Sequence, residues 1–182
     1  QAIEWFDLAN VGKSPSRFDF KKLENLNGHY IRETDDAKLA ELVGPKLALD
    51  AFQKELLVRA MPELKARAHD LNQLAEGAKF LFSKRPLDFD EAASALLTPE
   101  SRALLANAHR ALGATEWNHD GLEQSVREVA EAAGVKLGKL AQPLRAALTG
   151  RTTSPGIFDV LALLGKSESL ARIQDQMLEP NE

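Results

Sequence analysis

Residues 134–156 read GVKLGKLAQPLRAALTGRTTSPG, and they combine positive charge with residues that end helices. The stretch contains Lys136, Lys139, Arg145 and Arg151 but no Asp or Glu, whereas the whole chain carries −4, so the remaining residues together carry about −8. Glycine and proline residues that end helices predict short helical pieces joined by tight turns. They are Gly138, Pro143, Gly150 and Pro155-Gly156. Cations beside exposed, turn-rich backbone favour an anionic partner that is read at close range. The alternative interpretation is an ordinary helix-loop-helix with a solvated basic face.

Composition around this stretch predicts a helical, globular protein. The 182 residues suffice for one or two domains, and 44% hydrophobic with 27% charged residues can build a core. Only 6% of residues are aromatic while Ala and Leu are abundant, which favours helix over sheet. The chain contains no Cys, which excludes a disulfide scaffold and a thiolate metal site. It begins at Gln1 rather than Met, so we expect it to be part of a longer protein.

Helix boundaries can be predicted from capping residues and helix breakers. Starts are indicated where an N-cap residue precedes an apolar run at helical spacing, at Asp19, at Thr34-Asp35-Asp36, at Asp90, at Thr98-Pro99-Glu100, at Ser154-Pro155 and at Ser167. Ends are indicated at Asn27-Gly28, Gly44-Pro45, Gly113, Gly134 and Gly165. Pro62 is expected to interrupt or restart a helix, because proline removes a hydrogen bond inside one.

Apolar spacing predicts the buried faces of these helices. Leu71, Leu74, Ala78 and Phe82 lie on one face of an amphipathic helix. Trp117 is expected in the core, and so is a set of apolar residues near the N-terminus, Phe18, Leu23, Leu26 and Tyr30. No sustained alternation predicts a strand, and no repeat of 20 to 50 residues stands out. The predicted fold class is therefore all-α.

Two segments resemble the C-terminal part of bacterial glutamyl-tRNA synthetases. Residues 135–166, with PLRAALTG, a Ser-Pro-Gly turn and FDVLALLGK, match that family's pattern almost throughout. Residues 18–31 fit its pattern F-D-x-x-K-L-x-x-L-N-G-x-Y-I. The resemblance implies two consecutive helical anticodon-binding subdomains after a short remnant of the stem-contact domain. We place them at residues 35–85 and 86–182, with the remnant at residues 1–34.

The resemblance also implies which residues meet the anticodon. Arg67 corresponds to an arginine facing the third base, and Arg145 to one near the first. Ser154 and Pro155 correspond to the turn lining the second base. The remaining predicted contacts are apolar walls from Ile157 and Phe158 and phosphate or sugar contacts from Lys136 and Arg151. The chain departs from the family at three places, with Asp70 where Thr or Ser is common, Gln73 where Glu is common and Ser154 where Thr is frequent.

The donor pattern of Arg67 fits a cytosine at the third position. Cytosine presents O2 and N3 as neighbouring acceptors, and a guanidinium offers two parallel donors and no acceptor. Guanine, which is third in the glutamine anticodon, presents N1–H and N2–H donors that would face the donors of arginine. One good bidentate contact discriminates between bases by about 1–3 kcal/mol.

No motif in the sequence indicates an active site. The four histidines are scattered, without an HExxH motif or an i, i+4 pair, so we expect no metal site. Walker loops, nucleophile elbows and the HIGH and KMSKS signatures of class I synthetases do not occur either. We therefore expect no catalytic residue and no cofactor here, with ATP and Mg²⁺ serving the full-length ligase that the resemblance implies.

The resulting hypothesis is anticodon recognition within a glutamate–tRNA ligase. Its partners are glutamate tRNA isoacceptors, with no DNA and no membrane, because no apolar run approaches the roughly 18 residues of a membrane span. We expect a cytoplasmic monomer. Two alternatives stay open: a relaxed-specificity or diverged synthetase that also charges glutamine tRNA, and a helical protein-interaction module with an exposed apolar groove.

The first prediction concerns catalysis. Because the sequence lacks the signatures for activating an amino acid, the chain alone should catalyse no glutamate-dependent ATP–pyrophosphate exchange. The measurement is isotope exchange with and without tRNA, and clear activity in a clean preparation would contradict the assignment.

Overall fold

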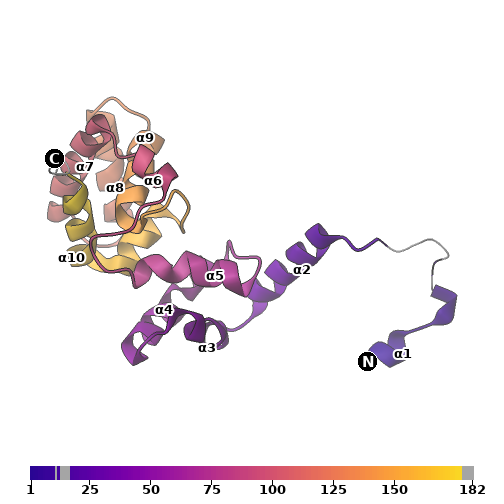
Figure 1. Cartoon of the computed structure of the whole chain (residues 1–182). Helices are drawn as coiled ribbons and strands as arrows, with labels where there is room; N and C mark the ends of the chain where they lie inside the picture. The colour runs from indigo at the N-terminus through magenta and orange to yellow at the C-terminus, as the bar shows by residue number, and fades with distance from the viewer. Residues whose placement is uncertain (11, 13–16, 178–182) are drawn as a thin grey trace.

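A computed structural model describes residues 1–10, 12 and 17–177, and it is helical throughout this part of the chain, with no strand (Figure 1). The all-α prediction is therefore confirmed. In chain order the elements are α1 Ala2–Trp5, η1 Leu8–Asn10, α2 Phe20–Glu33, α3 Asp36–Leu47, α4 Ala51–Lys65, α5 Leu71–Ala78, η2 Lys79–Leu81, α6 Glu91–Ala95, α7 Pro99–Ala114, α8 His119–Ala132, α9 Leu137–Thr149 and α10 Ile157–Met177.

Helix α2 begins as predicted and ends later than predicted. The Asp19 carboxylate caps it by accepting from the backbone N–H groups of Lys21 and Lys22. The helix does not stop at Asn27-Gly28 but continues to Glu33. Gly28 serves a close approach instead, because a Cβ there would lie 2.9 Å from His69 Nδ1. The glycine thus lets α2 contact the turn between α4 and α5.

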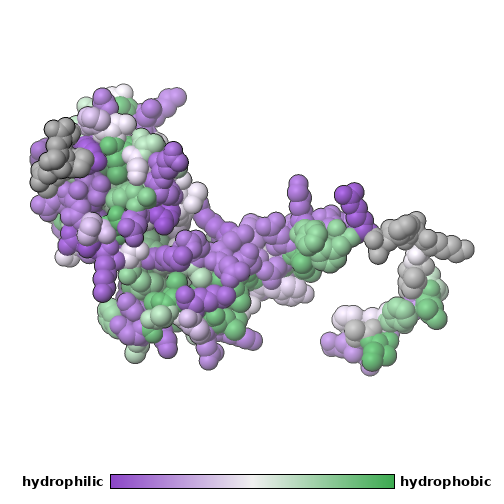
Figure 2. All heavy atoms as spheres, in the orientation of Figure 1, coloured by the Kyte–Doolittle hydropathy of each residue, from purple (hydrophilic) through white to green (hydrophobic). Residues whose placement is uncertain are grey.

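Four apolar residues in α2 and just before it are exposed, contrary to the core packing expected for them. Phe18, Leu23, Leu26 and Tyr30 are between 48% and 65% exposed. Only the side of the helix with Gly28 and Ile31 is buried. Figure 1 shows the reason, since α2 projects from the other helices, and Figure 2 shows the hydrophobic surface that it presents. Amphipathic spacing identified an apolar face here, but no described element covers it.

Helices α3, α4 and α5 pack against one another. Two predicted breaks are wrong in this group, since Pro45 lies inside α3 and Pro62 lies inside α4. Both prolines occur in the last turns, where each removes one backbone hydrogen bond. In α4 that loss is offset by the neighbouring Leu57, Met61 and Leu64, whose side chains are at most 4% exposed.

Helices α6 to α10 form the second group, and several predicted boundaries are confirmed there. Thr98 caps α7, and Gly134 follows α8 with φ +65°. Gly165 breaks the helical path of α10 with φ +75°. Gly113, in contrast, lies inside α7, which ends at Ala114. Trp117 packs against the core as expected, and its Nε1 donates to the Leu161 carbonyl at 3.3 Å.

Helix α9 is one continuous element rather than several short pieces. Gly138 and Pro143 both lie inside it, and the chain turns only at Gly150, with φ +69°. The burial of apolar side chains in α9 outweighs the tendency of Gly138 and Pro143 to break the helix. Four of these side chains are fully buried: Leu140, Leu144, Ala147 and Leu148. Because α9 is unbroken, the position of Arg145 relative to Gly150 is fixed by helix geometry.

A buried arginine joins the two helical groups. Arg172, in α10, is 2% exposed. Its Nη1 donates to the carbonyl oxygens of Phe80 at 2.8 Å and Leu148 at 2.7 Å, and its Nη2 donates to Ser83 at 3.0 Å. Its Nε pairs with Glu168 at 2.6 Å. The guanidinium therefore ties the chain after α5 and the end of α9 to α10.

The predicted subdomain division stays a prediction. Its boundaries at residues 34 and 85 fall after α2 and between η2 and α6. Helix α4 nevertheless also contacts α10, so the two helical groups touch.

The second prediction concerns Arg172. Arg172→Met keeps most of the side-chain volume but leaves buried carbonyl groups without a donor, so unfolding free energy should fall by about 3 kcal/mol. Urea denaturation followed by circular dichroism measures the loss.

Arg127→Met is the matched control. Arg127 also pairs with a glutamate one turn away, Glu123, but its side chain is 54% exposed. Its loss should cost less than about 1 kcal/mol. Equal effects of the two substitutions would show that Arg172 is not a structural junction.

Candidate nucleic-acid interface

The turn after α9 is held in place by backbone and side-chain hydrogen bonds. Thr149 Oγ1 donates to the Arg145 carbonyl at 2.8 Å and accepts from the Arg151 N–H at 3.2 Å. The Gly150 carbonyl accepts from the Asp90 N–H at 3.2 Å. Gly150 is required because its positive φ favours glycine and because a Cβ would collide with the Asp88 carbonyl. Residues 150–156 are thereby fixed against the chain that enters α6.

Two arginines from different helical groups converge on this turn. Arg67 follows α4, Arg145 lies in α9, and the Nη1 of each donates to the Ser154 carbonyl oxygen at 3.2 Å. The two Nη1 atoms therefore lie within about 6.4 Å of each other, which is twice that distance. Neither guanidinium forms an ion pair with any carboxylate in the described part of the chain. The result is a local concentration of unneutralised positive charge.

Arg145 is half-buried and shaped by the turn. Its Nη1 also donates to the Pro155 carbonyl at 2.7 Å and to the Ser154 hydroxyl. Burial, and then the positive charge of Arg67, lowers the pKa of the Arg145 guanidinium below its usual value. It stays charged at physiological pH because arginine does not lose its proton in proteins. Its Nε is buried without a hydrogen-bond partner among the described residues.

A cleft of about 460 Å³ opens beside this cluster. Arg67, Ser154 and Pro155 line it, together with Arg151 and Thr153 from the same turn. Its other wall comes from α4 and α5 and carries hydrogen-bonding side chains, Glu63, Gln73 and Glu76. The cleft therefore offers donors and acceptors on facing walls, with an apolar floor from Leu64 and Ala68.

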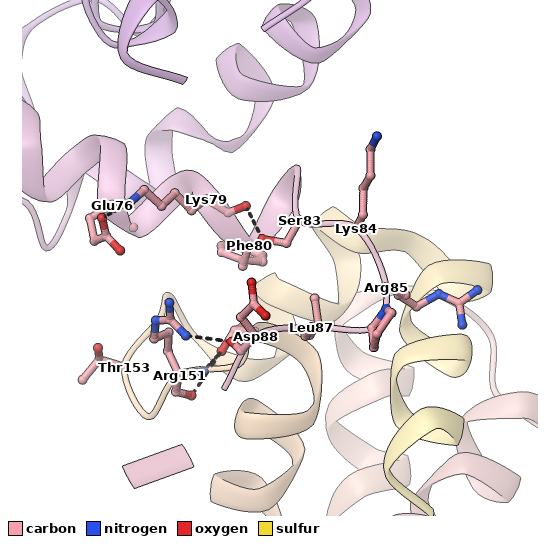
Figure 3. Close-up of a pocket in the computed structure, with 13 residues that line it drawn as sticks. Glu76, Lys79, Phe80, Ser83, Lys84, Arg85, Leu87, Asp88, Arg151 and Thr153 are labelled. Atoms are coloured by element: carbon pink, nitrogen blue, oxygen red, sulfur yellow. Dashed lines mark hydrogen bonds and ion pairs between the residues drawn. The ribbon is translucent and has the colours of Figure 1, made fainter. Parts of the chain in front are cut away.

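A second cleft of about 400 Å³ continues from the first, and the two share Glu76, Gly77, Arg151 and Thr153. Figure 3 shows Arg151 between its walls, reaching the Asp88 carbonyl, while Lys84 extends away from the other labelled side chains. Arg151 Nη1 donates to that carbonyl at 2.9 Å, and its Nε lies 3.9 Å from Asp90. Its side chain remains 44% exposed, so a phosphate could still approach it.

The remaining predicted residues are not at the cluster. Lys136 is the N-cap position of α9, nine residues before Arg145, which is about 13 Å along a helix axis. Ile157 is 7% exposed and belongs to the hydrophobic core, so it offers no free wall. Phe158 is half-buried, with its ring centroid 5.7 Å from that of His119. Thus Arg67, Arg145, Arg151, Ser154 and Pro155 come together, whereas Lys136, Ile157 and Phe158 lie around them.

The chain also matches a family of known proteins. The family described as the anticodon-binding domain matches residues 38–177. The chain belongs to the anticodon-binding domain family. Both clefts and helices α4 to α10 lie within the matched residues, and α3 begins two residues before them.

The relatives reported next are each described as a glutamate–tRNA ligase. Glutamate–tRNA ligase 2 of Rhizorhabdus wittichii is 64% identical over 97% of the chain and 39% of that protein. Glutamate–tRNA ligase 2 of Zymomonas mobilis is 57% identical over 97% of the chain and 38% of its own length. The chain thus spans about two fifths of these curated relatives. A solved glutamate tRNA ligase of Elizabethkingia meningosepticum is 26% identical, with a TM-score of 0.77 over 94% of this chain and 35% of that one.

Two departures from the family pattern preserve the local chemistry of α5. Asp70 is the N-cap and accepts from the backbone N–H groups of Asn72 and Gln73. The Gln73 side-chain oxygen accepts from the His69 N–H at 3.0 Å. Asp and Gln thus perform the capping that Thr or Ser and Glu can perform, so these positions bear on the start of the helix.

Sequence reasoning missed Glu63 and the Asp88 carbonyl as parts of the site. Neither shows a local signal, since a helix-surface Glu and a loop carbonyl look ordinary until the fold brings them beside residues 151–155. Two exclusions concern the described part of the chain alone. No group of three or more potential metal ligands occurs there, and no helix there has the length and apolarity to cross a membrane.

The third prediction concerns Gly150. Gly150→Ala imposes a positive φ on a residue with a Cβ, at about 1–2 kcal/mol, and adds a collision with the Asp88 carbonyl. Gly134→Ala is the control, because φ is +65° but nothing lies within 4 Å of the added Cβ. Unfolding free energies should differ by at least about 1 kcal/mol, with Gly150→Ala lower. Equal losses would show that the turn can move away from Asp88.

Proposed function

We propose that this chain binds the anticodon loop of glutamate tRNA, as the anticodon-binding part of a glutamate–tRNA ligase. The convergence of Arg67 and Arg145 on the Ser154 carbonyl, at the mouth of a cleft, carries the proposal. An anticodon loop offers unstacked bases between phosphates, and such loops are read on their base edges. Paired donors beside a pocket suit such a ligand better than a smooth basic face does.

The third base is assigned to Arg67 and the 460 Å³ cleft that it lines. Arg67 is exposed and is held by a single hydrogen bond to Ser154, so its other guanidinium donors are available. Two donors match O2 and N3 of cytosine and oppose the N1–H and N2–H donors of guanine. Since glutamate and glutamine anticodons differ at this base, Arg67 supplies the discrimination between them.

The first and second bases are assigned to Arg145 and to the turn at Ser154-Pro155. Both arginines contact the Ser154 carbonyl of this turn, which suits a middle base at the turn with one neighbour at each arginine. Nη1 of Arg145 already donates to three acceptors of the turn and its Nε is buried, so a base would meet Nη2. Phe158, three residues after Pro155, would be an apolar neighbour of the bound bases.

Backbone contacts are assigned to Arg151 and, farther along α9, to Lys136. Phosphate contacts position an RNA without reading its sequence. Arg151 suits this role because it lines both clefts and keeps an exposed side chain. Lys136 would meet a phosphate at a distance from the anticodon bases.

In the whole ligase we place glutamate activation outside these residues. ATP and Mg²⁺ would serve that reaction, and this chain would hold neither. We propose strict specificity for glutamate tRNA, since the departures at Asp70 and Gln73 act as helix caps. We further propose that the ligase is a monomer in the cytoplasm and that it does not bind DNA.

One observation favours the protein-interaction alternative, namely the exposed apolar face of α2. Such a module would show no salt-dependent binding of RNA, whereas phosphate contacts make RNA binding fall with salt. A titration with the glutamate anticodon hairpin and an unrelated hairpin, at two salt concentrations, separates the two functions.

The fourth prediction compares Arg67→Gln with Arg151→Gln. Gln carries both a donor and an acceptor, so Arg67→Gln should lose about 1–3 kcal/mol on a hairpin with third-base C and less on one with G. Arg151→Gln should weaken both hairpins alike and reduce the salt slope by about 0.7. Fluorescence anisotropy with the two hairpins measures both effects. Equal losses on both hairpins for Arg67→Gln would mean that Arg67 only positions the loop.

A further inference from the structure

Glu63 presents an unused carboxylate to the 460 Å³ cleft. It lies in the last turn of α4, four residues before Arg67, and lines the same cleft. Its side chain is exposed and forms no ion pair or hydrogen bond with any described residue. Arg67 would be its ordinary i, i+4 partner on a helix, but the Arg67 guanidinium is turned to the Ser154 carbonyl.

The other side chains on that wall that can accept a hydrogen bond each already have a partner on one oxygen. Glu76 pairs with Lys79 Nζ at 2.5 Å, and Gln73 Oε1 accepts from the His69 N–H at 3.0 Å. Glu63 is therefore the carboxylate on that wall that has both oxygens free of contacts with the described residues.

An unpaired carboxylate is unfavourable beside an RNA unless it contacts a donor. It repels phosphates, and a carboxylate that loses water without gaining a hydrogen bond costs free energy. Bases carry exocyclic amino groups that can supply such a donor. The chemistry of the wall thus points to a donor such as a base amino group rather than to a phosphate.

We propose that Glu63 accepts a hydrogen bond from the N4 amino group of the third anticodon base, and so selects cytosine over uracil. This inference rests on the proposed function and adds a second residue, besides Arg67, that recognises the third base. Cytosine shows one donor, N4–H, followed by the acceptors N3 and O2 along its edge. Glu63 and Arg67 together present one acceptor and a pair of donors, which complements that edge.

Arg67 alone already disfavours uracil, because the uracil N3–H is a donor that would face a guanidinium donor, and Glu63 adds a second, separate reason. Uracil places the O4 acceptor where cytosine has its amino group, and O4 would face the Glu63 carboxylate. The sugar fixes which end of the edge lies near Arg67, so guanine still presents its donors to the guanidinium. Glu63 therefore adds discrimination between the two pyrimidines.

The test uses anticodon hairpins that differ only in the third base. One carries cytosine, one carries uracil, and one carries 2-pyrimidinone, which keeps O2 and N3 but lacks the amino group. The chain should bind the cytosine hairpin about tenfold more tightly than the pyrimidinone hairpin, since a hydrogen bond to a charged group is lost. Uracil should bind more weakly still, because its O4 would face the Glu63 carboxylate and its N3–H would face the Arg67 donors.

Two variants and one control isolate Glu63. Glu63→Ala should bind cytosine and pyrimidinone hairpins equally, and Glu63→Gln should restore part of the preference because Gln keeps an oxygen acceptor. Glu55→Ala is the control for charge, since Glu55 is also exposed on α4 but lines neither cleft. It should keep the full preference while showing any general gain from removing a negative charge.

The outcomes separate the two claims. If the unmodified chain binds cytosine and pyrimidinone hairpins equally while Arg67→Gln still weakens binding, Glu63 does not read the amino group and the proposed function stands. A preference that persists in Glu63→Ala also overturns the inference. If no anticodon hairpin binds better than an unrelated hairpin, the proposed function itself fails.

Discussion

The buried guanidinium of Arg172 holds the two helical groups in one arrangement. It donates to carbonyl oxygens after α5 and at the end of α9, and it pairs with Glu168 on its own helix. Removing an arginine from water is expensive unless nearly every donor is satisfied, and here the contacts supply that satisfaction. Because the carbonyls belong to separate elements, the guanidinium also sets their spacing. The position of the turn at residues 150–156 depends on that spacing.

The site depends on the same arrangement, because its two arginines come from different groups. Arg67 lies just after α4 and Arg145 lies in α9, yet both donate to the Ser154 carbonyl oxygen. Sharing an acceptor keeps two like charges close together before any ligand arrives. A ligand with acceptor groups then meets donors that are already oriented, which limits the entropy lost on binding. The positive φ of Gly150 also contributes, because it starts the turn that brings the Ser154 carbonyl to the two arginines.

Local signals in the sequence predicted the fold well where one residue decides a boundary. Asp19, Thr98, Gly134 and Gly165 act at helix ends as their chemistry suggests. The wrong breaks at Pro62 and Pro143 share a cause, which is the burial of apolar neighbours in the intact helix. Arg172 could not be foreseen, since its short sequence context resembles a solvated helix face. The exposed face of α2 was misjudged because spacing reveals an apolar stripe but not what covers it.

The candidate site was predictable only through resemblance. Arg67 and Ser154 are 87 residues apart, so no local pattern connects them. The central claim is that their cleft receives the anticodon, and photocrosslinking tests it most directly. A glutamate anticodon hairpin with 4-thiouridine at the middle base should crosslink within residues 151–158, and much less in an unrelated loop. Crosslinks confined to other helices, or equal crosslinking by the unrelated loop, would contradict the account.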